Sequence, residues 1–212
     1  MCIRDRSIDL AGLADIYVND AFAASHRSHA SLVGIPRYLP SYFGLNFIHE
    51  YEELNKAMTP NHPSLFILGG AKFDTKMPLV KEYITKYDHV FVGGALANDV
   101  FKARGYEVGK SMVSDVDLSG DELLDNPKLI TPCDVTVDGP DGVRVCLPNE
   151  VKPNESILDA GPETIKQLTP LVMEAETVLW NGPLGFYESG FAKYTEALGQ
   201  IIADSKSYAV LG

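Results

Sequence analysis

An apolar run ends in Gly69-Gly70, and two lysines, Lys72 and Lys76, come within the next six residues. If a helix begins there, residues four apart lie on one helical face, so the two ammonium groups stand one turn from each other. Two neighbouring cations near the positive end of a helix dipole repel each other, and an anion between them relieves that repulsion. The spacing therefore favours phosphate binding, with two solvated lysines at a helix start as the alternative.

Two further side chains suit a phosphorylated or hydroxylated ligand. Arg27 lies in a loop of small residues, and its planar guanidinium can clamp a phosphate or carboxylate, unless it pairs with Asp20. Glu188 follows a glycine-rich segment and can accept hydrogen bonds from ribose hydroxyls, although a solvated surface glutamate is the alternative. His26 and His29 have no third ligand nearby in the sequence, so they do not predict a metal site.

The segment 105–111 is the nearest match to a phosphate-binding P-loop. It has three residues between its glycines where that motif has four, and a predicted helix precedes it where the motif requires a strand. We therefore interpret this segment as an ordinary loop at the end of a helix.

The elements that would position these side chains alternate between strand and helix. Strands are predicted at 64–68, 89–92, 156–158, 177–180 and 208–211, and most of them run into glycine. Helices are predicted at 77–87, 96–104, 163–174 and 191–205. This alternation predicts right-handed βαβ units and a parallel sheet. Ligands bind at the carboxyl ends of such strands, where glycine lets the backbone approach closely.

The rest of the chain divides around one amphipathic helix. Apolar residues at intervals of three and four predict a helix over 43–58, which follows Pro36 and Pro40 and suits a connector between two domains. A β-hairpin is predicted from 133–137 and 143–147, with turn residues between them. Residues 1–7 have neither helical nor strand periodicity, and we interpret them as non-native sequence.

Composition excludes several classes of protein. The 212 residues include 18 lysines and arginines against 29 aspartates and glutamates, a formal net charge of −11 that argues against a nucleic-acid partner. No apolar run approaches the ~18 residues that span a bilayer, so no membrane partner is expected. The N-terminus lacks the apolar stretch of a signal peptide. Three irregularly spaced cysteines predict neither a disulfide framework nor a zinc site, which favours the reducing cytoplasm.

Several motifs, taken in order, resemble those of the phosphoglycerate kinase family. They are VNDAF at 18–22, HRSHAS at 26–31, LGGAK at 68–72 with Lys76, VGG at 92–94, DAGPE at 159–163 and VLWNGPLG at 178–185. The resemblance implies an α/β fold with a three-layer, Rossmann-like, parallel-sheet lobe for the nucleotide at residues 60–212. It implies that residues 1–42 are the end of a second α/β lobe, which binds phosphoglycerate, and that 43–59 form an interdomain helix.

The same resemblance implies an activity. The family transfers a phosphoryl group reversibly between 1,3-bisphosphoglycerate and ADP, giving 3-phosphoglycerate and ATP, as a phosphotransferase of glycolysis and gluconeogenesis. Mg²⁺ accompanies the nucleotide. We expect a cytoplasmic monomer that acts on these small molecules.

Site residues follow from the resemblance position by position. Lys72 would stabilise the phosphoryl group in transfer, Arg27 would hold the phosphoglycerate, and Lys76 would bind nucleotide phosphate. The other positions implied for the nucleotide are Gly94, Asn181, Gly182 and, at the ribose, Glu188.

The sequence also departs from the family pattern. Ala95 replaces the third glycine of a Gly-Gly-Gly run, and no segment matches the family's opening strand or its other substrate-binding arginines and histidine. The family's metal-linked aspartate would follow Gly212. We therefore expect an internal fragment that is inactive alone. The alternative is a non-catalytic α/β module that binds adenine nucleotides.

Overall fold

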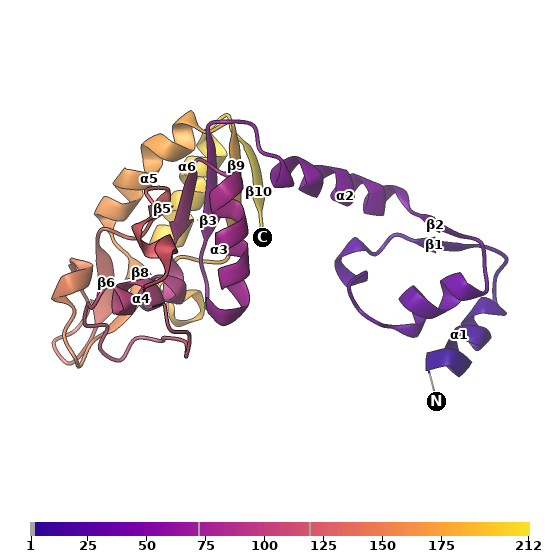
Figure 1. Ribbon diagram of the computed structural model, residues 1–212, viewed down its shortest axis with the longest axis horizontal. Coiled ribbons are helices and arrows are strands. Elements are labelled where there is room, and N and C mark those ends of the chain that lie inside the picture. The colour runs from indigo at the N-terminus through magenta and orange to yellow at the C-terminus, as the bar shows by residue number, and fades with distance from the viewer. Residues whose placement is uncertain (1–2, 72, 119) are drawn as a thin grey trace. The chain divides into compact units, whose positions relative to one another are not determined.

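The computed structural model describes residues 3–71, 73–118 and 120–212. The chain divides into two compact units, Met1–Met58 and Thr59–Gly212, and each is described by itself. Figure 1 labels most of their helices and strands.

The first unit contains two longer helices and a two-stranded sheet. Its elements are α1 (Ile3–Ala11), β1 (Tyr17–Asn19), the short turns η1 (Phe22–Ala24), η2 (Ala30–Gly34) and η3 (Ile35–Arg37), then β2 (Ser41–Phe43) and α2 (Leu45–Met58). β1 and β2 pair in parallel. α1 begins at Ile3, within the segment 1–7 whose sequence shows no helical period. Ser7 is buried, and its Oγ donates to the Ile3 carbonyl within the helix and to the Ala30 carbonyl of η2.

The predicted helix 43–58 is confirmed as α2, which begins at Leu45. Asp20 fixes its start: the carboxylate accepts the backbone N–H of Phe47 at 2.9 Å and the Asn46 side-chain amide at 2.6 Å. The ring of Phe47 stacks on Phe43, with 4.3 Å between ring centroids. A side-chain carboxylate at this place satisfies N–H groups that a helix leaves without partners.

The second unit is built on a five-stranded parallel sheet, as the alternation of elements predicted. Its strand order is β10 (Tyr208–Leu211), β9 (Thr177–Asn181), β3 (Ser64–Leu68), β4 (His89–Val92) and β5 (Leu129–Ile130). The pairing is parallel throughout. The edge strand β5 was not predicted, because two residues carry no readable period.

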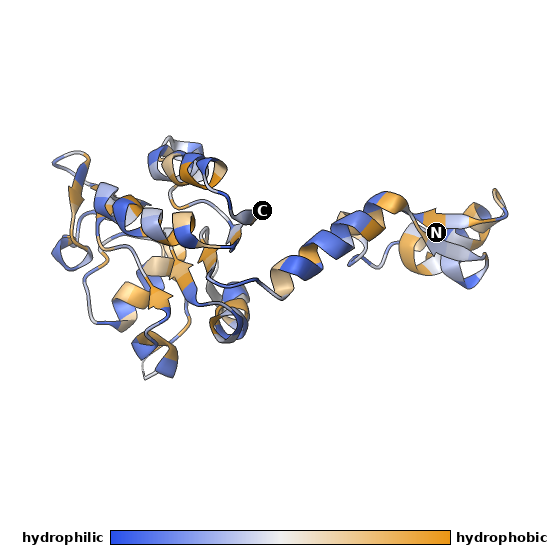
Figure 2. Cartoon of the chain, turned by 90° about the horizontal axis from the view of Figure 1, so that it is seen from above, coloured by the Kyte–Doolittle hydropathy of each residue, from blue (hydrophilic) through white to orange (hydrophobic). Residues whose placement is uncertain are grey.

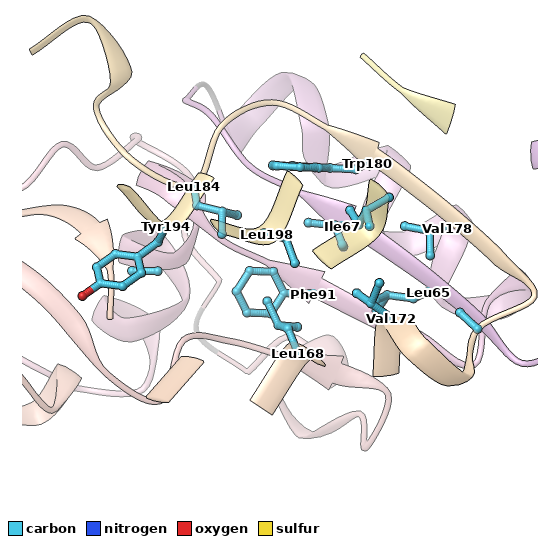
Figure 3. Packing of buried hydrophobic residues seen from close by; sticks show 13 residues of the cluster. Leu65, Ile67, Phe91, Leu168, Val172, Val178, Trp180, Leu184, Tyr194 and Leu198 are labelled. Carbon is cyan, nitrogen blue, oxygen red and sulfur yellow. The ribbon is translucent and has the colours of Figure 1, made fainter. Parts of the chain in front are cut away.

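Helices cover both faces of this sheet. Leu65 and Ile67 of β3 point into an apolar cluster with Leu168 of α5 (Pro162–Glu174) and Leu198 of α6 (Lys193–Asp204), as Figure 3 shows. On the opposite face Phe66 contacts Tyr83 of α3 (Phe73–Lys86), with ring centroids 4.4 Å apart. Alternate side chains of a strand point to opposite faces, so all three residues of β3 are buried and three layers result.

A second, antiparallel sheet follows α4 (Gly94–Ala103) along the chain. Its order is β7 (Arg144–Cys146), β6 (Val135–Asp138) and β8 (Ser156–Ala160), and the predicted hairpin is confirmed as β6 and β7. The prediction that β8 joins the parallel sheet is wrong, because β8 pairs with β6 in antiparallel fashion. Ile157 packs on a separate cluster around Phe101 and Val137, which holds β8 in this sheet.

The helices of the second unit are amphipathic, and each carries both hydrophilic and hydrophobic residues (Figure 2). Short helical turns complete it: η4 (Glu122–Asp125), η5 (Pro148–Glu150) and η6 (Tyr187–Ser189). Within the described part of the chain, no helix combines the length and the apolar character needed to cross a membrane.

Candidate functional site

The carboxyl ends of β3, β4 and β9 interlock through their backbones. Gly69 N–H donates to the Asn181 carbonyl and Gly70 N–H to the Pro183 carbonyl, both at 2.8 Å. A Cβ on Gly69 would lie 2.2 Å from the Pro183 carbonyl oxygen, and one on Gly94 would lie 2.7 Å from Gly70 N. Gly94 also has a φ of +58°, which side-chain-bearing residues rarely adopt. We call these residues, with Gly182, the glycine wall.

Lys76 lies in the first turns of α3 beside the glycine wall. Its Nζ donates to the Gly69 carbonyl at 2.9 Å and to Asn181 Oδ1 at 3.3 Å. Burial lowers the pKa of Lys76, because desolvation disfavours its charged form. The carbonyl of Gly182 accepts the indole N–H of Trp180 at 2.7 Å, which fixes the segment that follows β9.

The structure therefore brings four of the predicted residues together: Lys76, Gly94, Asn181 and Gly182. A further predicted residue, Lys72, lies outside the described residues.

A cavity of about 610 Å³ adjoins the glycine wall. It is within the size range of small-molecule sites, and most of its lining is apolar. Gly94 and Glu188, both predicted, are among its lining residues; Glu188 lies in η6. The full lining is Gly70, Ala71, Gly94, Ala95, Ala97, Asn98, Phe101, Lys110, Ser111, Met112, Pro132, Val135, Ser156, Ile157, Leu158, Asp159, Ala160, Pro183, Leu184, Gly185, Phe186 and Glu188.

Another side of the cavity consists of residues 110–112 and the start of β8, which we call the pinned wall. Asn98 Nδ2 of α4 donates to the Met112 carbonyl at 2.9 Å. Ser111 Oγ accepts the Ile157 N–H at 2.8 Å, and Lys110 N–H donates to the Glu155 carbonyl at 2.7 Å. The pinned wall thus depends on partners far from it in the sequence.

Sequence reasoning missed the pinned wall. The interpretation of 105–111 as a loop that ends a helix is confirmed in that α4 stops at Ala103 and Gly105 follows with φ of +81°. The same loop continues into Lys110 and Ser111, which line the cavity. No local spacing signals this role, because the hydrogen bonds that place these residues come from other elements.

Asp159, at the carboxyl end of β8, is also part of the cavity lining and is 3% exposed. It accepts the Ala160 N–H at 2.8 Å and the Tyr194 N–H at 3.4 Å. Burial nevertheless raises the pKa of Asp159 to about 6, because loss of water outweighs these hydrogen bonds. The sequence offered no sign of this buried carboxyl beyond its place after a strand.

Arg27 lies in the other unit, between η1 and η2, and is exposed. No ion pair joins it to Asp20 within the described ranges. The Asp20 carboxylate instead caps α2 through Asn46 and Phe47. The alternative explanation for Arg27, a pair with Asp20, is therefore wrong.

The described residues contain no group of three or more His, Cys, Asp or Glu side chains that could hold a metal ion. What the arrangement does fit is an apolar ring system inside the cavity and an anion beside Lys76, whose charge is incompletely solvated.

Comparison with known proteins gives a consistent result. The family model described as phosphoglycerate kinase matches residues 6–212. A phosphoglycerate kinase of Novosphingobium aromaticivorans is 40% identical over 207 residues, which cover 91% of this chain and 52% of that protein. One of Moorella thermoacetica is 38% identical over 217 residues, covering 96% and 55%. The chain thus spans about half the length of these curated relatives.

The chain also resembles solved structures of phosphoglycerate kinases. The phosphoglycerate kinase of Coxiella burnetii superposes with a TM-score of 0.86 at 36% identity, over 99% of this chain and 57% of the other. That of Pyrococcus horikoshii gives a TM-score of 0.87 at 30% identity, over 100% and 58%. Both likenesses extend through the cavity and the two units that contain the predicted residues.

Proposed function

The chain belongs to the phosphoglycerate kinase family, and on this premise we propose that its second unit is the adenine-nucleotide-binding part of such a kinase. The observation that carries the proposal is the apolar cavity beside the glycine wall, with Lys76 at its edge. The base would occupy the cavity. The phosphates would extend past Gly70 towards Lys76, since a Cβ on Gly70 would lie 3.2 Å from Lys76 Nζ.

Individual residues take roles on this proposal. Gly94 would lie against the nucleotide, where any side chain would meet Gly70. Asn181 and Gly182 would shape the pocket and hold Lys76 Nζ in place through Asn181 Oδ1. Glu188, exposed in the cavity lining, would accept hydrogen bonds from the ribose hydroxyls.

The proposed reaction is phosphoryl transfer from the acyl phosphate of 1,3-bisphosphoglycerate to ADP. A terminal phosphate oxygen of ADP attacks the phosphorus, the bond to the acyl oxygen breaks, and the carboxylate of 3-phosphoglycerate leaves. Such transfer depends on positioning and charge stabilisation. We assign Lys72 to the phosphoryl group in transfer and Arg27 to the phosphoglycerate. Mg²⁺ would arrive with the nucleotide phosphates.

We also propose that the protein acts in the cytoplasm as a monomer, without nucleic-acid or membrane partners. The acidic net charge of −11 and the free thiols of Cys133 and Cys146 support this setting.

Titration of the 212-residue chain with Mg-ADP, followed by the fluorescence of Trp180, tests the nucleotide site. Trp180 is the sole tryptophan, and its indole holds Gly182 in the glycine wall. We expect saturable binding, and we expect Lys76→Ala to weaken it by on the order of tenfold or more, since a charge-assisted phosphate contact is lost.

Lys86→Ala is the matched control, because Lys86 lies at the other end of α3 and pairs with Glu82. Its affinity for ADP should equal that of the unmodified chain. A folded chain that shows no saturable response to Mg-ADP, or a Lys76→Ala variant that binds as tightly as the parent, would contradict the proposal.

A further inference from the structure

Glu155 is a buried carboxylate with no role in the proposed nucleotide contacts. It is 2% exposed and lies immediately before β8. Arg144 of β7 binds it with two hydrogen bonds of 2.8 Å, from Nε to Oε1 and from Nη2 to Oε2. The Lys152 N–H donates to Oε2 at 2.9 Å. These hydrogen bonds, that of Arg144 above all, lower the pKa of Glu155 to about 2, so the pair is ionised at neutral pH.

The backbone of the same residue supports the pinned wall. The Glu155 carbonyl accepts the Lys110 N–H at 2.7 Å. Segment 109–110 packs directly on this carbonyl, since a Cβ on Gly109 would lie 2.2 Å from its oxygen. The next two residues, Ser156 and Ile157, line the cavity, and Ile157 N–H donates to Ser111 Oγ. The loop segment and the strand start that make up the pinned wall therefore meet at Glu155.

The side chain of Glu155 leaves its backbone little freedom. Arg144 holds the carboxylate in a two-point geometry that a point charge could not impose. Arg144 Nη2 also donates to the Glu150 carbonyl at 2.9 Å, so the guanidinium ties β7 to both ends of segment 150–155. If the carboxylate moved, the carbonyl that receives Lys110 N–H would move with it.

We propose that Arg144 and Glu155 form a positioning pair, which sets the pinned wall against the nucleotide base without touching the nucleotide. The proposal rests on the proposed function. It assigns the pair a share of the affinity for the base and none of the affinity for the phosphates, because Lys76 and the glycine wall are held by different contacts.

Calorimetric titration of the 212-residue chain with ADP, and with inorganic pyrophosphate in competition with ADP, tests the pair. The variants are Glu155→Gln, which keeps the shape of the side chain and removes its charge, and Arg144→Lys, which keeps the charge and removes the two-point geometry. We expect each to weaken ADP binding by on the order of tenfold and to leave pyrophosphate binding unchanged. Asp141→Asn is the matched control, because it breaks an exposed ion pair with Lys152 in the same region and should change neither affinity.

The outcomes separate the two proposals. A folded parent chain that binds neither ligand contradicts the proposed function. If the parent binds ADP but both variants bind it equally well, the positioning pair is wrong and the nucleotide site stands. An equal loss of ADP and pyrophosphate also overturns the pair, since it indicates general damage to the unit. Should Glu155→Gln fail to fold, the same criteria apply to Arg144→Lys, whose side chain is one-third exposed.

Discussion

The two walls of the cavity are built by opposite means. The glycine wall is made of backbone against backbone, with N–H and carbonyl groups of three strand ends joined directly. The pinned wall is made of loop and strand that side chains from α4, β7 and the segment before β8 hold in place. Backbone hydrogen bonds join the strand ends of the first wall, whereas side-chain hydrogen bonds hold much of the second.

The two walls are therefore sensitive to substitutions at different kinds of position. In the glycine wall the sensitive positions are the glycines, because a Cβ on Gly69, Gly94 or Gly182 would lie within 3 Å of backbone atoms. The pinned wall depends in addition on Arg144 and Glu155, which are not among the lining residues. The expected effect of a substitution on stability and ADP binding therefore depends on whether it disturbs the backbone contacts of the glycine wall or the side-chain contacts of the pinned wall.

The largest effect is expected from Gly94→Ala. Its new methyl group would lie 2.7 Å from Gly70 N at a φ of +58°, so we expect about 3 kcal/mol of destabilisation together with loss of ADP binding. Denaturant unfolding and ADP titration measure both. Gly105→Ala is the control: φ is +81° but no atom lies within 4 Å, so only the backbone strain of about 1 kcal/mol should appear. Equal costs at both positions would refute the backbone-contact explanation.

Asp134→Ala should have the next largest effect. The buried Asp134 carboxylate accepts the N–H groups of Thr164 at 2.7 Å and Glu163 at 2.9 Å, at the start of α5. Loss of this cap should cost about 2 kcal/mol in the free energy of unfolding, measured by urea titration. Glu163→Gln removes only an exposed pair with Lys166 and should stay within about 0.5 kcal/mol of the parent.

Ser111→Ala tests the pinned wall at a residue that lines the cavity. It deprives the Ile157 N–H of its acceptor at 2.8 Å, and an unpaired N–H of this kind should cost about 1 kcal/mol. We expect ADP affinity to fall by only a few-fold, because the Asn98 and Glu155 contacts to the same wall remain. A loss of ADP binding as complete as that of Gly94→Ala would erase the distinction between the walls.

Asp159→Asn should act mainly on the pH dependence of stability, and its effect should be smallest near pH 4, where the side chain of the folded parent is also uncharged. Between its ordinary value of 3.8 and its folded pKa of about 6, the folded chain retains a proton that the unfolded chain releases. Stability of the parent therefore falls as pH rises through this window and levels off above it. The variant should lack that part of the slope. Unfolding titrations at intervals between pH 4 and pH 7 test this, and an unchanged slope would contradict the raised pKa.

The glycine wall could be predicted from the sequence because a glycine-containing pair marks the end of each of its strands. Gly69-Gly70, Gly93-Gly94 and Asn181-Gly182 follow apolar runs, and parallel strands bring such ends to one edge. The same local logic found α2 and the hairpin. It failed for β8, because a strand's sequence does not reveal which sheet it joins.

The pinned wall could not be predicted for a related reason. Lys110 and Ser111 acquire their place from Glu155 and Ile157, over forty residues later in the chain. Glu155 in turn is fixed by Arg144, a pairing with no periodic signature. The burial of Asp159 could not be predicted either, since it depends on contact with Tyr194 of α6.

The strand order also bears on how the cavity forms during biosynthesis. β3 lies between β4, which follows it closely in the sequence, and β9, which is far from it. The pairing of β3 with β9 places Ser64 opposite Thr177. A contact between such distant positions closes a long loop at an entropic cost, whereas the hairpin of β6 and β7 closes a short one. On the ribosome one edge of β3 stays unpaired until Thr177–Asn181 has emerged, and until then the nascent sheet is open to association with other chains. Because the glycine wall joins the ends of β3, β4 and β9, the proposed nucleotide site is complete only after most of this unit has been synthesised.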